Sequence, residues 1–600
     1  MTIDTDPRLD WSLEGEPRSG RFGDVYFSKD DGLAESRAVF LAGCGLPDAW
    51  AGRRRFVVGE LGFGTGLNIA ALLTLWRDSR PAGARLNVFS IEAYPLSRDE
   101  ARRALTAWPE IAPAAEALLA AWPESTPGLH RLDLPQFDAV LDLFIGEVET
   151  ALSQWTGRAD AWFLDGFSPA LNPAMWSEAV MDGVAVRSAA GARLSTFTVA
   201  GHVRRALAAR GFEVEKRPGH GRKRERLEAR LPGAASATAA PSALVLGAGV
   251  GGAAVARALG AEGVAVTVVE DGASDLASGF PLALATPRLD AGDAVLAALY
   301  AAVLERARRL YLDLPDAVAV EGVVQMEAAD RDARRYDHIA QQAVWPVGAM
   351  NRLESAEVAS RLQEADLPGA LLMSGALAVR PSVIRQSWLE STARITAHIA
   401  RVERRGDLWA LIDAGGEAIA AADHLVLAGG WGVQGLWSEA PLSPVRGQAD
   451  WVATDGAPFA AAWGGYGVSD GRLMLFGATH DRGETDTTVR AEDSARNLAA
   501  LQARMPGKAD RVSAAESSAR AAVRATTPDR LPLCGEIEAG LHVLGGLGSR
   551  GFCVAPLLAE HIAARIVGAP SPLTVDQAAR LNPLRFRMRP LAQPDGLDEA

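Results

Sequence analysis

The chain has 600 residues and a formal net charge of −13; hydrophobic residues make up 48% of it and charged residues 22%. This length exceeds what one hydrophobic core holds and predicts two or three domains. The composition is typical of globular proteins and excludes wholesale disorder. The acidic balance argues against a general nucleic-acid binder, which needs a basic domain, but it leaves room for a local basic surface.

The cysteines and the apolar segments limit where the protein works. Cys44, Cys534 and Cys553 show no metal-ligand spacing, so we expect no metal site and a reducing, cytoplasmic environment. The first residues, MTIDTD, are acidic and do not resemble a secretory signal. Residues 234–256 carry no charge and are long enough for a membrane span, but Pro241 and a glycine cluster interrupt them. We therefore expect no membrane contact.

In the first part of the chain, short apolar segments alternate with helical patterns. Strands are expected at residues 56–61, 86–91, 161–164 and 194–198, with a helix after Gly66. This alternation predicts an α/β fold with a mostly parallel, doubly wound sheet, a Rossmann-like architecture.

A glycine-rich loop closes the first of these strands. Residues 57–66 read VVGELGFGTG, a spacing that leaves room for a bulky nucleoside without a pyrophosphate, as in S-adenosylmethionine-dependent methyltransferases. Acidic residues at strand ends accept hydrogen bonds from ribose or amine groups. We therefore expect cofactor binding by Glu60, which would face the ammonium group, by Gly62, Gly64 and Gly66, and by Glu92, which would face the ribose.

A second acidic strand end lies further along the chain. Residues 160–169 read DAWFLDGFSP, so Asp165 ends an apolar strand and precedes a turn. Ligands of open α/β sheets sit outside the carboxyl ends of the strands. Asp165 is therefore placed where a methyl acceptor would arrive; the alternative is an aspartate that only caps a helix or a turn.

A linker separates this region from a second nucleotide-binding fold. Residues 232–241 read PGAASATAAP and predict domains at 1–232 and 242–600, joined by a linker at 233–241. Strands at 243–246 and 264–269 flank a helix at 252–259. The loop between them holds the dinucleotide fingerprint, in which bare backbone approaches a pyrophosphate and an acidic residue about twenty positions later meets the ribose. These residues are Gly247, Gly249, Gly252 and Glu270.

The rest of the second half predicts an inserted subdomain. A strand at 424–428 resembles a return to the nucleotide fold. The residues before it, and those from about 441 to 515, would form an α+β subdomain that covers the substrate. Basic runs at 222–226 (RKRER) and 585–589 (RFRMR) are candidates for RNA contact; the alternative is a solvated charged face.

The sequence resembles the family of bifunctional tRNA 5-methylaminomethyl-2-thiouridine biosynthesis proteins over nearly its whole length. In the first half the resemblance rests on FGDVYFS at 22–28, ELGFGTGLN at 60–68, WFLDGF at 162–167, NPAMW at 172–176, TFT at 196–198 and GRKR at 221–224. It implies adenosylmethionine binding by Glu60, the loop at 62–66, Glu92 and Glu147, which stands where we expect Asp. Asp165 matches the position that receives the aminomethyl group.

The second half resembles the FAD-dependent oxidoreductase domain of that family, which is of D-amino-acid-oxidase type. LGGLGSRGF at 544–552, before an apolar helix at 555–567, resembles the second flavin-contacting loop of such oxidases and implicates Gly548 and Gly551. RATTPDRLP at 524–532 and VRGQ at 445–448 resemble other segments near their flavin. Together these favour FAD over NAD. Phe280 and the two residues after it stand where we expect a polar turn containing Asn.

The resemblance implies two consecutive reactions on the wobble uridine of tRNA. The FAD domain oxidises a carboxymethylaminomethyl side chain, hydride passes to the flavin, and the imine hydrolyses to a primary amine. The methyltransferase domain then methylates that amine, with Asp165 orienting it and accepting its proton. Arg550 is the candidate cation for the substrate carboxylate; the alternative is that it only supports the flavin loop.

Two other functions remain open at this point. One is a methyltransferase fused to an oxidase of small amino acids, which the acidic charge suits. The other is a tRNA-binding protein whose flavin domain is catalytically silent.

Overall fold

The computed structural model describes residues 6–12, 16–27, 31–221, 224–234, 240–273 and 275–587. The chain divides into two compact units, Met1–Ala239 with Ala569–Val575 and Ala240–Gly568 with Asp576–Ala600. The predicted linker at 233–241 falls largely on residues 235–239, which lie outside the described residues.

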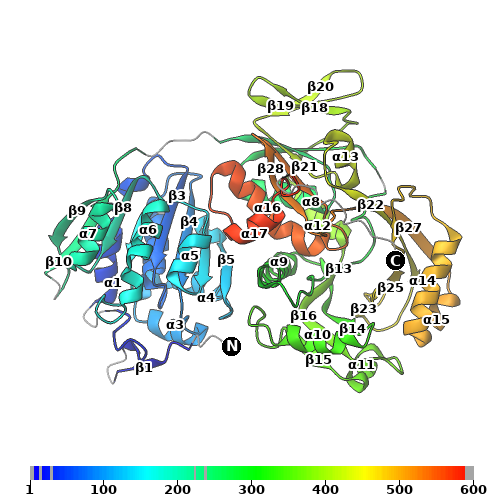
Figure 1. Ribbon diagram of the computed structural model, residues 1–600, viewed down its shortest axis with the longest axis horizontal. Coiled ribbons are helices and arrows are strands. Elements are labelled where there is room, and N and C mark those ends of the chain that lie inside the picture. Colours follow the sequence, from blue (N-terminus) through cyan, green and yellow to red (C-terminus); the bar gives the residue numbers. More distant parts are fainter. Residues whose placement is uncertain are drawn as a thin grey trace, which may run out of the picture. The chain divides into compact units, whose positions relative to one another are not determined.

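The first unit is built on one eight-stranded sheet (Figure 1). Five central strands are parallel, as the alternating pattern predicts, and antiparallel strands flank them. In spatial order the strands are β5 (Gly128–Leu134), β6 (Ala139–Ile145), β4 (Arg85–Glu92), β3 (Arg55–Leu61), β7 (Ala159–Leu164), β8 (Ser188–Thr196), β10 (Glu225–Arg230) and β9 (Glu213–Pro218). A small hairpin, β1 (Leu9–Trp11) with β2 (Pro17–Ser19), precedes them.

Helices cover both faces of this sheet because its strands are apolar on both sides. Successive side chains of a strand point to opposite faces. On β3, Phe56 and Val58 join one apolar cluster, whereas Val57 and Leu61 join another. The helices are α1 (Gly32–Ser36), α2 (Leu67–Ser79), α3 (Arg98–Leu105) and α4 (Ala112–Ala120), then α5 (Val148–Gln154), α6 (Glu178–Val186) and α7 (Gly201–Ala209).

A short C-terminal segment also belongs to the first unit, although the expected boundary gave everything after residue 241 to the second. Within Ala569–Val575, Leu573 is fully buried, and the Ser571 backbone N–H donates to the Thr156 hydroxyl at 3.3 Å. The Arg131 guanidinium donates to the backbone oxygen of Pro570 at 3.1 Å. No sequence pattern marks such a return of the chain.

The second unit contains the expected nucleotide fold. Its six-stranded sheet has the order β17 (Ala393–Thr396), β12 (Ala265–Glu270), β11 (Ser242–Leu246), β21 (His424–Leu427), β29 (Leu541–Gly545) and β28 (Leu533–Glu538), with only β28 antiparallel. Around this fold lie α8 (Val250–Ala261), α9 (Ala294–Leu312), α12 (Pro381–Leu389), α13 (Val433–Leu436), α16 (Gly551–Val567) and α17 (Val575–Leu581).

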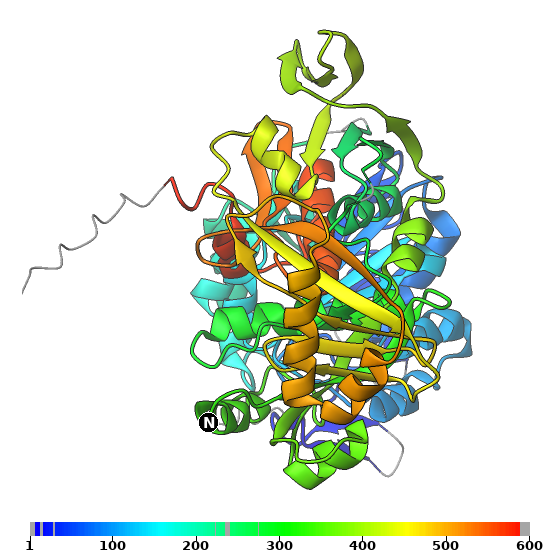
Figure 2. The ribbon, with the colours of Figure 1, turned by 90° about the vertical axis from the view of Figure 1, so that its right-hand side faces the viewer.

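The inserted subdomain is a larger, mostly antiparallel sheet. It consists of β13 (Ala283–Ala285), β14 (Val318–Met326), β15 (Met350–Leu353), β16 (Ala370–Val379), β22 (Ser443–Ala453), β23 (Phe459–Ala462), β24 (Tyr466–Ser469), β25 (Leu473–Gly477), β26 (Asp481–Arg482) and β27 (Ser517–Thr526). It extends beyond the expected residue 515, because β27 pairs with β22 along its length. Figure 2 shows α14 (Ala491–Arg504) and α15 (Pro506–Ser513) lying across it; α10 (Arg331–Ala340) and α11 (Ser355–Leu362) complete the subdomain.

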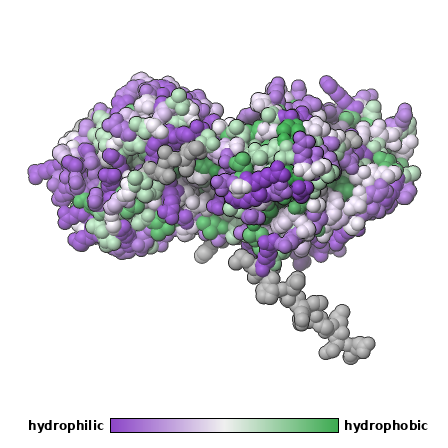
Figure 3. Space-filling view, turned by 90° about the horizontal axis from the view of Figure 1, so that it is seen from above, coloured by the Kyte–Doolittle hydropathy of each residue, from purple (hydrophilic) through white to green (hydrophobic). Residues whose placement is uncertain are grey.

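A separate three-stranded sheet was not predicted. β18 (Arg401–Arg405), β19 (Leu408–Ile412) and β20 (Ala418–Ala422) form a meander that projects from the second unit in Figures 1 and 2. Polar and apolar residues are intermixed on the face seen in Figure 3. Among the described residues, no helix combines the length and apolar character that crossing a membrane requires.

Candidate active sites

The first candidate site lies at the carboxyl ends of β3 and β7, where the order of the sheet reverses. β3 pairs with β4 on one side and with β7 on the other. Ligands of open α/β sheets bind at such a point. Glu60, Glu92 and Asp165 lie in or directly after β3, β4 and β7 at this edge. The fold therefore brings the three predicted carboxylates to the same edge of the sheet.

The loop between β3 and α2 forms a cradle of bare backbone. Gly62 has φ +93°, and a Cβ there would stand 2.6 Å from the backbone oxygen of Asp165. Gly66 has φ +80° and is the N-cap of α2. Gly64 lies against the ring of Tyr26. Glycine at position 62 is therefore needed for the loop to pack against the backbone of Asp165, and the loop presents bare backbone beside the strand ends, as expected for a nucleoside-binding loop.

Glu60 is a fully buried carboxyl group at the end of β3. Its Oε2 accepts a hydrogen bond of 2.5 Å from the Ser90 hydroxyl, whereas its Oε1 has no partner among the described residues. Burial raises the pKa of Glu60 well above its usual range, and the nearby Asp165 raises it further. An unpaired buried oxygen is costly unless a ligand meets it. Glu60 thus fits the ammonium group of adenosylmethionine.

Glu92 and Glu147 lie at the ends of neighbouring strands. Glu92 accepts hydrogen bonds of 2.9 Å from the backbone N–H groups of Gly64 and Tyr94, which fix its carboxylate beside the loop. Burial raises the pKa of Glu92. Glu147 is exposed at the N-cap of α5, and the Gly146 N–H donates to the backbone oxygen of Glu92 at 2.9 Å. Since a carboxylate oxygen accepts more than one hydrogen bond, Glu92 retains capacity for ribose hydroxyls.

Asp165 is half-buried and makes a short contact that sequence reasoning did not identify. The Nδ2 amide of Asn68, near the start of α2, donates to Oδ2 of Asp165 at 2.6 Å. Asn68 was visible only as the last residue of the run at 60–68. The sequence gave no signal for the contact between Asn68 and Asp165, because the two residues are ninety-seven positions apart.

Aromatic rings surround the same edge. The ring of Phe167 lies 5.0 Å from that of Phe22 and 5.3 Å from that of Tyr26. A hydrogen bond of 3.1 Å from the Ser168 N–H to Asp24 ties the N-terminal segment to the turn after β7. Half-buried aromatic rings are suited to stacking on a nucleobase.

The second candidate site begins with the dinucleotide loop. A Cβ on Gly252 would stand 1.8 Å from the backbone oxygen of Gly247, so this tight turn requires glycine at position 252. Gly249 is the N-cap of α8 and lies beside the hydroxyl of Ser278. That hydroxyl accepts a hydrogen bond of 3.1 Å from the Val250 N–H. This close backbone approach at a helix N-terminus fits the pyrophosphate of a dinucleotide.

The second predicted loop meets the first. Gly551 begins α16, and a Cβ there would stand 3.2 Å from the Val250 side chain. Gly548 has φ +56°, and its N–H donates to the backbone oxygen of Ala525 at 3.0 Å. Phe280, in place of the expected polar residue, is half-buried. The structure thus brings together two loops that are about three hundred residues apart in sequence.

Glu270 ends β12, as the fingerprint predicts, and is paired with Arg394. The carboxylate also favours the charged form of Arg385, whose pKa burial lowers. Arg385 Nε donates to the backbone oxygen of Ala248 in the glycine loop at 2.9 Å. Glu270 is therefore in place at the strand end, but with a cationic partner that the sequence did not reveal.

Arg550 is bound to backbone. Its Nη1 donates to the backbone oxygens of Thr286 at 3.2 Å and Pro287 at 2.6 Å. Burial lowers the pKa of Arg550, while Tyr300 favours its charged form. These bonds agree with the alternative interpretation, in which Arg550 supports the backbone beside the flavin loop.

Arg524 is a second cation with a lowered pKa, and burial is the main cause. It lies on β27, donates to the backbone oxygen of Thr479 at 2.9 Å, and interacts electrostatically with the half-buried Tyr466. The sequence run at 524–532 contains it, but only as part of a family pattern. A desolvated guanidinium beside a tyrosine is suited to binding a carboxylate.

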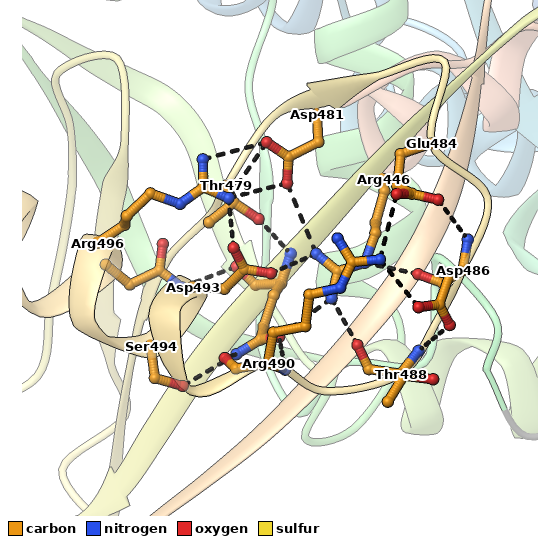
Figure 4. Close-up of polar contacts among 12 residues, drawn as sticks. Arg446, Thr479, Asp481, Glu484, Asp486, Thr488, Arg490, Asp493, Ser494 and Arg496 are labelled. Carbon is orange, nitrogen blue, oxygen red and sulfur yellow. Dashed lines mark hydrogen bonds and ion pairs between the residues drawn. The ribbon is translucent and has the colours of Figure 1, made fainter.

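The VRGQ segment on β22 has a structural role at its arginine. Figure 4 shows the Arg446 guanidinium, which is fully buried, surrounded by acceptors. It pairs with Asp493 and donates to the backbone oxygens of Asp486 and Thr488, each at 2.6 Å. Arg446 thereby fixes the segment before α14 to β22.

The basic runs are largely neutralised where the structure describes them. Arg222 and Lys223 lie outside the described residues. Arg226 donates to Glu228 at 2.6 Å and to the backbone oxygen of Pro218 at 2.7 Å. In the C-terminal run, Arg585 pairs with Asp529 and Arg587 with Glu439, and residues from 588 onward lie outside the described residues. These ion pairs are what the solvated-face interpretation expects for Arg226, Arg585 and Arg587.

Comparisons with known proteins agree with this division. A family model described as S-adenosyl-L-methionine-dependent methyltransferase matches residues 109–232, and one described as FAD dependent oxidoreductase matches residues 242–565. The chain thus combines a domain that uses adenosylmethionine with a domain that uses FAD. Iminodiacetate oxidase from Chelativorans sp. BNC1 is 20% identical, with a TM-score of 0.51, and the match covers 57% of this chain and 98% of that chain. This likeness shows the oxidase fold of the second unit.

Curated relatives match the chain from end to end. A protein of Caulobacter vibrioides (strain ATCC 19089 / CIP 103742 / CB 15) is 55% identical over 587 residues, 98% of each chain. One of Maricaulis maris (strain MCS10) is 43% identical, with 97% of this chain and 96% of the relative covered. Both are named tRNA 5-methylaminomethyl-2-thiouridine biosynthesis bifunctional protein MnmC. Identity at this level over both units shows that the chain belongs to the family of tRNA 5-methylaminomethyl-2-thiouridine biosynthesis bifunctional proteins.

Proposed function

We propose that the protein performs two consecutive steps at the wobble uridine of tRNA. The first converts 5-carboxymethylaminomethyl(-2-thio)uridine to 5-aminomethyl(-2-thio)uridine, and the second methylates the new amine to give 5-methylaminomethyl(-2-thio)uridine. The observation that carries this proposal is the pair of cofactor cradles in one chain, one with the buried, unpaired Glu60 oxygen and one with the Gly247–Gly252 turn. The names of its full-length relatives support the choice of substrate.

In the second unit, the substrate loses a hydride from the carboxymethyl carbon that is bonded to its secondary amine, and it loses a proton from that amine. Water then adds to the C=N bond and releases the primary amine and a two-carbon aldehyde acid. When bound, FAD accepts the hydride. The protein must hold the substrate carboxylate with a cation, and Arg550 and Arg524 are the candidates. The contacts of Arg550 with backbone favour Arg524 for this role.

In the first unit, the bond between nitrogen and the methyl carbon forms as the bond between sulfur and that carbon breaks. When bound, adenosylmethionine supplies the electrophilic methyl group. Asp165 orients the neutral amine of the methyl acceptor and takes its proton. Glu60 holds the ammonium group of adenosylmethionine, and Glu92 and Glu147 hold the side of its ribose and base. The loop at 62–66 holds the nucleoside. In the second unit, Gly247, Gly249, Gly252, Gly548, Gly551 and Glu270 hold the FAD.

The two activities would reside in domains at 1–232 and 242–600, with residues 569–575 completing the first. A tRNA substrate and three buried, unpaired cysteines among the described residues support a cytoplasmic location. We expect tRNA to be bound by cationic side chains other than Arg226, Arg585 and Arg587, because these three arginines are paired with carboxylates.

Flavin spectroscopy separates this function from the alternatives. The purified protein, kept without oxygen, is mixed either with tRNA that carries the carboxymethylaminomethyl group or with glycine. We expect the flavin absorbance to bleach with the tRNA only. Bleaching with glycine would indicate an amino-acid oxidase, and no bleaching with either would indicate a catalytically silent flavin domain.

A further inference from the structure

The inserted sheet of the second unit has two faces with different neighbours. Arg446 on β22 pairs with Asp493 on α14. Two residues further along the strand, the Gln448 amide donates to the Ser494 hydroxyl of the same helix at 2.9 Å. Because successive side chains of a strand alternate between faces, the odd-numbered residues of this part of β22, Val445 among them, face away from α14.

The face away from α14, which we call the inner face, borders the dinucleotide loop. Arg520 on β27 is the register partner of Ala449 on β22 and so lies on the inner face. Its guanidinium donates to the backbone oxygen of Gly279. The hydroxyl of the adjacent Ser278 accepts a hydrogen bond of 3.1 Å from the Val250 N–H at the start of α8. A ligand beside this loop therefore meets the inner face of the sheet.

Two further arginines share one row of the inner face. Val445 is the register partner of Arg482 on β26 and of Arg524 on β27. Residues directly opposite each other on paired strands point to the same face, and two strand spacings separate these arginines by roughly 10 Å at Cα. The Arg524 guanidinium lies over the bare backbone of Gly447, where a Cβ would stand 2.0 Å from its Nη2. Arg524 is thus half-buried against the sheet, whereas Arg482 is exposed.

The positive charge of Arg482 is not neutralised. The neighbouring carboxylate of Asp481 pairs with Arg446 and, at 2.9 Å, with Arg496 (Figure 4). These partners belong to the α14 side of the sheet. Among the residues that the structure describes, the Arg482 side chain has no ion pair or hydrogen bond.

Another exposed cation follows the end of β27. Arg530 lies in the turn after the strand, and its backbone N–H donates to the Thr527 oxygen at 3.1 Å. The adjacent carboxylate of Asp529 pairs with Arg585 at 2.8 Å. The Arg530 side chain has no such partner within the described ranges.

His480 reports on the charge around it. This residue directly precedes β26 and is exposed. Burial lowers the pKa of His480, and the positive charges of Arg524, Arg482 and Arg530 lower it further; the opposite effect of Asp481 is smaller. The three guanidinium groups therefore act on one place, where they attract anions.

We infer that the exposed Arg482 and Arg530 bind phosphate groups of the tRNA backbone beside the wobble nucleotide, while Arg524 remains for the substrate carboxylate. A modified tRNA carries both kinds of anion. Exposed, unpaired cations bind phosphate by releasing counterions from the RNA. Two separate anion sites on one face favour an RNA over a small amine, which has no phosphate. This inference rests on the proposed oxidation of a tRNA side chain by the second unit.

The test is the salt dependence of tRNA binding by the full chain. The flavin is reduced beforehand and oxygen is excluded, so that tRNA carrying the carboxymethylaminomethyl group binds but is not consumed. Each phosphate contact contributes about 0.7 to 0.9 to the slope of log affinity against log salt concentration. We expect Arg482→Gln to lower the slope by one such contribution, and the double variant Arg482→Gln, Arg530→Gln to lower it by two. Arg482→Lys keeps the charge and should retain the wild-type slope.

Arg472→Gln is the matched control. It removes the same charge from an exposed arginine just before β25, whereas the segment that leads to Arg482 leaves the other end of that strand. Its slope should equal that of the wild type, and flavin absorbance before reduction shows that each variant is folded. An unchanged slope in the double variant, or an equal fall in Arg472→Gln, would overturn the inference. Failure of this tRNA to bleach the oxidised wild-type flavin would instead overturn the proposed function.

Discussion

The guanidinium of Arg550 donates a hydrogen bond of 2.6 Å to the backbone oxygen of Pro287. A second bond from the same nitrogen reaches the backbone oxygen of Thr286. The side chain thus ties the start of α16 to the segment that follows β13. Arg524 donates to the backbone oxygen of Thr479 and lies beside a tyrosine.

This contrast predicts different kinetic effects for the two arginines. Arg524→Ala should raise the KM for the carboxymethylaminomethyl tRNA by about ten- to one-hundred-fold, the usual scale for losing a charge-assisted hydrogen bond, with flavin content unchanged. Arg550→Ala should lower flavin content and thermal stability. The measurements are steady-state oxidation kinetics and the ratio of flavin to protein absorbance. Raised KM with full flavin content in Arg550→Ala would assign carboxylate binding to Arg550.

Glu60 predicts a pH-dependent stability of the cofactor-free protein. Because its folded-state pKa lies above its unfolded value, Glu60 destabilises the fold increasingly as pH rises from the unfolded pKa, about 4.3, toward the raised folded value. Glu60→Gln removes this penalty, so the variant should gain stability relative to wild type as pH increases from 5 to 8. Thermal unfolding at both pH values measures the difference. Glu147→Gln, at an exposed carboxylate, is the control; an equal gain in that variant would contradict the prediction.

The Gly252 turn predicts loss of flavin when a methyl group is added. Gly252→Ala would place Cβ within 1.8 Å of the Gly247 oxygen, so the loop must shift and the pyrophosphate site is distorted. Gly260→Ala, on the same helix, meets nothing within 4 Å and should bind flavin normally. The purified variants are compared by flavin absorbance. Full flavin occupancy in Gly252→Ala would show that this turn does not hold the cofactor.

The C-terminal segment of the first unit predicts how the chain tolerates cutting. A fragment of residues 1–234 lacks the buried Leu573 and the Thr156 contact with Ser571. We expect a fragment of residues 240–600 to retain flavin, and the 1–234 fragment to bind adenosylmethionine but melt at a lower temperature than the same fragment with residues 569–575 attached. Calorimetric melting of both N-terminal fragments tests this. Identical melting temperatures would show that the segment contributes nothing to the first unit.

The sequence predicted those parts of both sites that depend on local pattern. The strand β3, the loop at 62–66 and the Gly247–Gly252 turn follow from apolar runs and glycine spacing, which nearby residues determine. Asn68 and Arg524 were missed as site residues because their contacts join distant segments, and polar residues of these types occur throughout the chain. The return of residues 569–575 to the first unit likewise depends on tertiary packing alone.

Product analysis tests the central claim most directly. The full chain is incubated with tRNA carrying the carboxymethylaminomethyl group, with or without adenosylmethionine, and the nucleosides are identified by mass spectrometry. We predict 5-aminomethyl(-2-thio)uridine without adenosylmethionine and 5-methylaminomethyl(-2-thio)uridine with it, and a fall of about two orders of magnitude in the methylation rate for Asp165→Asn, the usual scale for a general base. Unchanged nucleosides under both conditions would contradict the account.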